Sequence, residues 1–199
     1  MPDPFELCRR HPDFRPLSSL NVTLDLRYAG EMNITGRDLY QGEKEAWLHR
    51  EAFVRLEEAI AALQRRVPWR LRIYDAARPL SVQRRLFAQV QGTPQEAYVA
   101  DPQQHSVHNY GLAVDLGLED ETGQELDLGT PFDSFDPLAQ PRMELDCLAQ
   151  GRLSTRQRDL RMILRESMLM AGFIQHPLEW WHFDAKGLKD IKGHYLLIS

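Results

Sequence analysis

Alternating apolar and polar positions predict three β-strands in this chain. The segments NVTLDLRYA (residues 21–29), WRLRIYDA (69–76) and GLAVDLGLED (111–120) largely follow the two-residue period of a half-buried strand. A fourth segment, LEWWHFDA (178–185), is short and aromatic, and it either forms a strand or leads into one. Between these segments, residues 30–42, 92–104 and 129–141 contain the glycine, proline and polar residues typical of loops.

Apolar residues at helical spacing predict three helices. The clearest one covers residues 43–66, with Glu and Arg on the face opposite its apolar stripe. That stripe consists of Phe53, Leu56, Ile60 and Leu63. Residues 81–90 form the second helix and residues 154–171 the third. Gly172 follows the third helix at the position of a left-handed C-terminal cap, which indicates that the helix ends there.

The order of these elements predicts the fold class. Helices and strands are mixed without strict β-α-β alternation, so we expect an α+β fold in which helices pack on a mainly antiparallel sheet. A Gly-rich phosphate loop is absent from the sequence, which argues against a nucleotide-binding fold. Without a repeat or a long linker, residues 1–199 are expected to form a single domain. Residues 1–20, rich in proline, are expected to be irregular.

Charge and composition narrow the range of partners and locations. The net charge of −5 and the pI of about 5.8 argue against nucleic acid and anionic membranes as partners, because both favour a basic surface. No segment approaches the ~18 apolar residues of a membrane span. The N-terminus lacks an apolar signal region, so we expect a cytoplasmic protein, or a periplasmic one if a signal has been removed. The oligomeric state stays open, a homo-oligomer included.

The two cysteines do not indicate a metal or disulfide site. Cys8 and Cys147 are far apart in the chain, and the sequence contains no CxxC pair. We therefore expect two free, mostly buried thiols. Any metal ligands in this chain have to come from histidine and carboxylate side chains instead.

The predicted strand at residues 111–120 contains an unusual acid. Leu112, Val114, Leu116 and Leu118 point to one face, whereas Ala113, Asp115 and Gly117 point to the other. The small neighbours leave room for a bulky group near Asp115. His108 lies seven residues before Asp115, so a regular strand would place the two on opposite faces. They can meet only if the chain bends between them, which Gly111 allows.

Each of these residues also has an ordinary structural interpretation. A lone strand aspartate is commonly a hydrogen-bonded structural acid, and a loop histidine such as His108 is commonly a surface residue. The segment EWWHFD adds Glu179 and His182, which are close enough in sequence to serve one site. Two histidines and one aspartate would bind zinc and leave a fourth position for water. Glu179 would suit the role of the general base.

Two motifs together resemble the signature of the M15 zinc D,D-peptidases. SxHxxGxAxD is present from Ser106 to Asp115, and Glu-Trp-Trp-His, an ExWH pattern, is present from Glu179 to His182. The second motif, Glu-Trp-Trp-His, is similar to the corresponding motif of VanX-type D-alanyl-D-alanine dipeptidases. Shorter matches cover much of the remaining chain; they are Tyr28-Ala29, Asn33-Ile34-Thr35-Gly36, Asp75-Ala76-Ala77-Arg78-Pro79 and Phe132-Asp133.

The resemblance implies a ligand set and catalytic residues. His108, Asp115 and His182 would hold one Zn²⁺ per chain. Glu179 would act first as general base and then as general acid, and Arg78 would stabilise the oxyanion of the tetrahedral intermediate. Without the motif, Arg78 reads as a surface arginine at a strand end.

The resemblance also implies a small D,D-dipeptide as the substrate. Tyr28 and Asp133 would face its ammonium group, and Ser106 would lie near its carboxylate, although Asp133 also reads as a solvated loop acid. The chain departs from the family pattern at two places near the pocket. Val107 stands where the family often has serine, and Ala76-Ala77 stand where it more often has Gly-Tyr.

The activity implied is hydrolysis of D-Ala-D-Ala to free D-alanine. Two alternatives remain: a zinc D,D-carboxypeptidase or endopeptidase acting on peptidoglycan stem peptides, and a binding module with a structural zinc. At least one of Trp180 and Trp181 is expected in the core, because an indole buries a large area. His105 and His176 are expected to be surface histidines outside the site.

Overall fold

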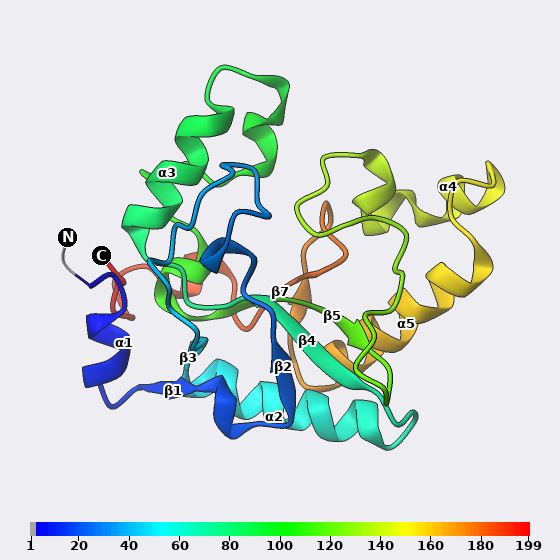
Figure 1. Ribbon diagram of the computed structural model, residues 1–199, viewed down its shortest axis with the longest axis horizontal. Coiled ribbons are helices and arrows are strands. Elements are labelled where there is room, and N and C mark those ends of the chain that lie inside the picture. Colours follow the sequence, from blue (N-terminus) through cyan, green and yellow to red (C-terminus); the bar gives the residue numbers. More distant parts are fainter. Residues whose placement is uncertain (1–2) are drawn as a thin grey trace.

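Five strands form the central sheet of the computed structural model, which describes residues 3–199 (Figure 1). In spatial order they are β2 (Val22–Leu24), β4 (Arg70–Asp75), β5 (Ala113–Glu119), β7 (His182–Asp184) and β6 (Ile174–Gln175). β2 pairs with β4 in parallel, and the remaining neighbours are antiparallel. The predicted α+β class with a mainly antiparallel sheet is therefore confirmed.

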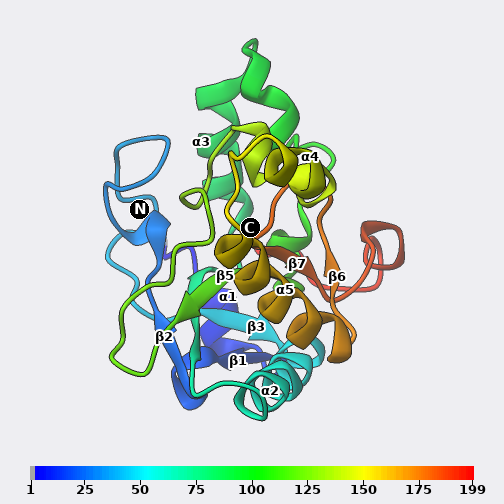
Figure 2. The ribbon, with the colours of Figure 1, turned by 90° about the vertical axis from the view of Figure 1, so that its right-hand side faces the viewer.

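Two long helices pack beside one another and against this sheet. They are α2 (Arg50–Gln64) and α5 (Thr155–Met170), which run side by side in Figure 2. Leu56 and Leu63 of α2 share one buried cluster with Leu164 of α5 and with the strand residues Ile73 and Leu116. The apolar stripes read from the sequence thus face the sheet. Burial of this area is the main favourable contribution to the stability of the fold.

The N-terminal third of the chain differs from the prediction. The helix expected to begin at residue 43 begins at Arg50, because residues Trp47–His49 form strand β3 instead. β3 pairs antiparallel with β1 (Phe14–Pro16) in a separate two-stranded sheet. Residues 1–20 are therefore not irregular throughout, and α1 (Glu6–Arg10) precedes β1; residues 1–2 lie outside the described part. The strand predicted at 21–29 is limited to β2, and Arg27–Ala29 form a 3₁₀ turn.

The remaining elements frame the space above the sheet. α3 (Leu80–Val90) and the 3₁₀ helix η3 (Pro94–Tyr98) lie on one side. The loop at 129–141 and α4 (Glu144–Ala149) lie on the other side (Figure 1). Gly172 has the left-handed φ of +81° expected of a helix C-cap. In the described residues 3–199, helices both long and apolar enough to cross a bilayer are absent.

A bulge in β4 aligns three polar side chains across the sheet. Ile73 pairs with Leu116, but the next pair is Asp75 with Asp115, so Tyr74 is the extra residue. Asp115 in turn pairs with His182. The room predicted beside Asp115 is partly filled from this bulge: a Cβ on Gly117 would lie 2.2 Å from the Tyr74 hydroxyl. The sheet register therefore brings Asp75, Asp115 and His182 into one row.

Candidate metal centre and active site

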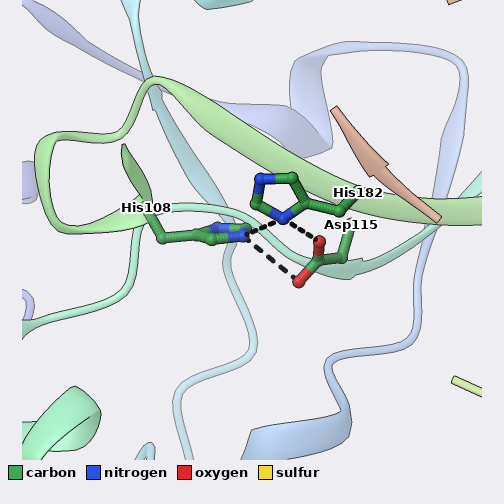
Figure 3. Close-up of side chains that lie close together, drawn as sticks. All are labelled: His108, Asp115 and His182. Carbon is green, nitrogen blue, oxygen red and sulfur yellow. Dashed lines mark hydrogen bonds and ion pairs between the residues drawn. The ribbon is translucent and has the colours of Figure 1, made fainter. Parts of the chain in front are cut away.

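Two histidines and an aspartate converge at the middle of the sheet (Figure 3). His108 Nε2 lies 3.1 Å from His182 Nδ1 and 3.2 Å from Asp115 Oδ2, and His182 Nδ1 lies 2.9 Å from Asp115 Oδ1. All three residues are buried. The structure thus brings together the three metal ligands that the sequence predicts.

His108 reaches Asp115 because the chain turns sharply before β5. His108 lies in the 3₁₀ helix η4 (Val107–Tyr110), which ends at Gly111 with a left-handed φ of +65°. A Cβ at Gly111 would lie 2.8 Å from the Phe14 ring and 3.0 Å from the backbone nitrogen of His49. The bend predicted at this glycine is confirmed, and glycine is required there by both its conformation and its close packing.

Each histidine is oriented through its second ring nitrogen. His108 Nδ1 lies 2.7 Å from the carbonyl oxygen of Ala76, and His182 Nε2 lies 2.9 Å from Asp184 Oδ1. If each ring donates its N–H to this acceptor, His108 Nε2 and His182 Nδ1 each keep a free lone pair. This is the arrangement found around metal-bound histidines. Sequence reasoning missed Asp184. Its two-residue spacing from His182 on a strand would have placed both side chains on one face.

The donor set fits a divalent metal ion. Around tetrahedral zinc with bonds of about 2.0–2.1 Å, neighbouring ligand atoms lie about 3.3 Å apart, close to the separations of 2.9–3.2 Å found here. Two imidazole lone pairs facing each other at 3.1 Å repel unless a positive charge lies between them. Two imidazoles and one carboxylate are ligands that a first-row metal such as zinc accepts.

The charges around the triad also favour a cation. Burial acts to raise the pKa of Asp115, but His108 and His182 hold it well below its usual range. Burial acts to lower the pKa of His182, but Asp184 and Asp115 hold it well above its usual range. The carboxylates of Asp115 and Asp184 thus favour a positive charge at the two histidines, where a metal ion would replace a proton.

Glu179 places a free carboxyl beside the triad. Its Oε2 lies 3.8 Å from His182 Nδ1, and 17% of its side chain is exposed. Burial raises the pKa of Glu179 to about 8, because a carboxylate loses hydration there. A bound cation next to it would oppose this rise. The carboxyl is thus close enough to exchange a proton with a group held at the triad, as a general base must be.

Arg78 is fixed at the other side of Asp115. Its Nε donates to Asp75 Oδ2 at 2.7 Å, one Nη donates to Gln83 Oε1 at 3.0 Å, and the other Nη lies 3.3 Å from Asp115 Oδ2. The guanidinium carbon lies 5.0 Å from the centre of the Tyr28 ring. The surface interpretation of Arg78 is wrong, because only 8% of the residue is exposed.

A pocket of about 300 Å³ opens above these residues. The substrate-binding residues predicted from the resemblance all line it; they are Tyr28, Ser106 and Asp133. The Tyr28 hydroxyl donates to Asp133 Oδ2 at 2.8 Å. Asp133 is half-buried, and burial raises its pKa to about 7, so it differs from a fully solvated loop acid. Asp133 also has a left-handed φ of +59°, a strained conformation that commonly occurs at functional sites.

Both neighbouring indoles, Trp180 and Trp181, lie in the buried core beside the pocket. Trp180 is buried, as expected of at least one indole, and its ring nitrogen donates to Thr130 Oγ1. Trp181 lines the pocket. His105 and His176 line it too, so their predicted position outside the site is wrong. Their sequence surroundings carried no signal of this, because the fold alone brings them there.

Comparisons with known proteins give one family match and several similar relatives. The family model described as Peptidase_M15, D-ala-D-ala dipeptidase, matches residues 19–196. A D-alanyl-D-alanine dipeptidase of Escherichia coli (strain K12) is 34% identical over 171 residues, covering 82% of this chain and 79% of the relative. A protein of that name from Synechocystis sp. is 29% identical over 175 residues, covering 72% and 71%. One from Enterococcus faecium is 34% identical over 89 residues, covering 44% and 39%.

Proposed function

Because this chain belongs to the D-Ala-D-Ala dipeptidase family of M15 peptidases, and is therefore a hydrolase, we propose that it hydrolyses the D-Ala-D-Ala dipeptide to free D-alanine with one zinc ion per chain. The observation that carries the proposal is the juxtaposition of the His-Asp-His triad with the carboxyl of Glu179, 3.8 Å from His182 Nδ1. A purely structural zinc site would not need that carboxyl.

His108 Nε2, His182 Nδ1 and one carboxylate oxygen of Asp115 would hold the zinc ion. When bound, zinc supplies a water of lowered pKa and polarises the carbonyl group that is attacked. The hydrogen bonds of the two histidines to Ala76 and Asp184 keep both rings in the required orientation before any substrate arrives. The ligands therefore need little rearrangement to bind the metal.

Glu179 would transfer the proton. Its carboxylate accepts a proton from the attacking water at Oε2 and then donates it to the nitrogen of the leaving D-alanine. Both transfers need the carboxyl to be close to the scissile bond and not already engaged in a strong ion pair. Its nearest titratable neighbours, His182 and His176, lie 3.8 and 3.9 Å away, which leaves Oε2 available.

Arg78 would stabilise the negative oxygen of the tetrahedral intermediate. Its guanidinium is buried and held by Asp75 and Gln83, so it does not need to reorganise as charge develops. A fixed donor of this kind contributes roughly 3–4 kcal/mol to transition-state stabilisation. The backbone of Arg78 is fixed as well, because Asn109 Nδ2 donates to its carbonyl oxygen at 2.8 Å.

The two ends of the dipeptide would be recognised by different residues of the pocket. Asp133, held by Tyr28, would accept hydrogen bonds from the ammonium group. The Ser106 hydroxyl would donate to the carboxylate. Its oxygen accepts from the His108 backbone nitrogen at 3.4 Å, so its own proton is available for the substrate. This requirement for a free ammonium favours the dipeptide over longer stem peptides.

One set of measurements tests the proposal. Purified protein should contain about one zinc per chain and hydrolyse D-Ala-D-Ala, but not L-Ala-L-Ala or a pentapeptide ending in D-Ala-D-Ala. Equal activity on the pentapeptide would instead assign the protein as a D,D-carboxypeptidase or endopeptidase. Zinc-loaded protein without activity on any of the three peptides would refute a hydrolytic role.

A further inference from the structure

A buried arginine lies behind the site, on helix α5. Arg161 is only 1% exposed. Its Nε donates to the carbonyl oxygen of Leu128 at 2.6 Å, and one Nη donates to that of Leu138 at 2.9 Å. Glu144 lies 3.5 Å away and balances part of the charge. A guanidinium at this depth must be well compensated, because an uncompensated buried charge is strongly destabilising.

The two carbonyl groups belong to the two ends of one loop. Leu128 and Leu138 bracket residues 129–137, the segment that carries Asp133 and other pocket-lining residues. One rigid, planar side chain therefore fixes the distance between the ends of the loop. Lysine could not do the same, because its ammonium is a single point at the end of a flexible chain.

Trp180 ties the same loop to the catalytic segment. The Arg161 guanidinium carbon lies 5.7 Å from the centre of the Trp180 ring. The Trp180 ring nitrogen donates to Thr130 Oγ1 at 2.8 Å, and its backbone nitrogen donates to the carbonyl oxygen of Ala139 at 3.0 Å. Since Trp180 directly follows Glu179, the loop and the proposed general base share one support.

Gly129 permits this close approach. Its φ is +99°, and a Cβ there would lie 2.8 Å from Leu153 Cδ1 and 3.2 Å from the second Nη of Arg161. That second Nη is buried and has no hydrogen-bond partner within residues 3–199. The hydrogen bonds of the guanidinium thus go to the two loop carbonyls, and both N–H groups of the second Nη are left without a partner in the described part of the chain.

We propose that Arg161 is a positioning residue that holds the 129–137 loop so that Asp133 meets the substrate's ammonium group. The inference rests on the proposed function, because it takes from it the role of Asp133. Arg161 does not touch the substrate. It acts through the loop, so its loss should weaken substrate binding while leaving the metal ligands on the sheet in place.

The test uses a double-mutant cycle in the full, zinc-loaded protein. Arg161→Met should lower kcat/KM for D-Ala-D-Ala by about 10²-fold, mainly through a higher KM, because displacement by about 1 Å has that scale of effect. Zinc content should remain one per chain. In the Asp133→Asn background, the same substitution should raise KM little further, since the group that it positions is already altered.

Arg165→Met is the matched control. Arg165 lies one turn further along α5 and shares the partner Glu144, but its other partner is Gln175 instead of the loop. Its KM should stay close to that of the unmodified protein. If Arg161→Met does not fold, Arg161→Lys decides, because it keeps the charge but can reach only one carbonyl; it should also raise KM.

The outcomes separate the two proposals. If Asp133→Asn leaves KM unchanged, the proposed role of Asp133 fails, and this inference fails with it. If Asp133→Asn raises KM but the Arg161 variants do not, the positioning role alone is overturned. Loss of activity by the same factor in both backgrounds, with KM unchanged, would also overturn it, because that pattern reports a smaller folded fraction.

Discussion

Removal of Asp184 tests whether the metal site depends on the acceptor behind it. Asp184 Oδ1 lies 2.9 Å from His182 Nε2 and fixes the ring so that Nδ1 faces Asp115 and His108. Loss of such an acceptor typically costs 10–100-fold in metal affinity. The Asp184 side chain is 20% exposed, so water can partly replace it. We therefore expect Asp184→Ala to weaken zinc binding about tenfold, or about 1.4 kcal/mol.

Competition against a chromophoric chelator of known zinc affinity measures this Kd. Asp184→Asn keeps an oxygen acceptor and should lose less affinity than Asp184→Ala. Asp159→Ala is the control for net charge, because this acid is 53% exposed on α5 and should leave the Kd unchanged. A Kd for Asp184→Ala equal to that of the unmodified protein would refute the orienting role. So would an equal loss in Asp159→Ala, which would indicate a general charge effect.

Three further predictions follow from the same geometry. Glu179→Ala should abolish turnover while zinc stays bound, measured by product release and metal analysis; full activity would rule out Glu179 as the base. Arg78→Ala should lower kcat by about 10²–10³-fold and change KM less, and an unchanged kcat would contradict the oxyanion role. Gly111→Ala should lower the free energy of unfolding in urea by about 1–2 kcal/mol or more, since φ is +65° and the new Cβ would contact Phe14; an unaltered unfolding midpoint would contradict that reasoning.

The parts of the fold that were predicted are those set by local pattern. Helix α3 and helix α5 begin and end within about a residue of the expected positions, because their apolar stripes lie within the segments themselves and Ser154 caps α5. The strand β3 was missed because Trp47–His49 pair with Phe14–Pro16, more than thirty positions earlier in the chain. Local spacing carries no information about such a partner, and tertiary pairing outweighs helical propensity there.

Within the site, too, features set by local sequence were predicted, whereas contacts between distant segments were not. His108, Asp115 and His182 were predicted because they stand in a motif, and Gly111 because a bend was geometrically required. The hydrogen-bond acceptors of the two histidines, the Ala76 carbonyl and Asp184, were not predicted. The Ala76 carbonyl is a backbone group that any residue could supply, and the bulge at Tyr74 that aligns Asp75 with Asp115 depends on a pairing between strands. His176 likewise has no local signal, yet it lies at the pocket.

The proposed metal ligands and the proposed substrate-binding residue Asp133 are held by different parts of the fold. The proposed ligands Asp115 and His182 are neighbours in the sheet register, and His108 is held by a backbone carbonyl beside β4. Asp133, in contrast, lies on a loop whose position depends on Arg161 and Trp180. A change in the loop can therefore alter which peptide end is accepted without disturbing the metal. Because loops tolerate substitution better than paired strands do, changes in substrate preference are expected to arise there, on an unchanged metal centre.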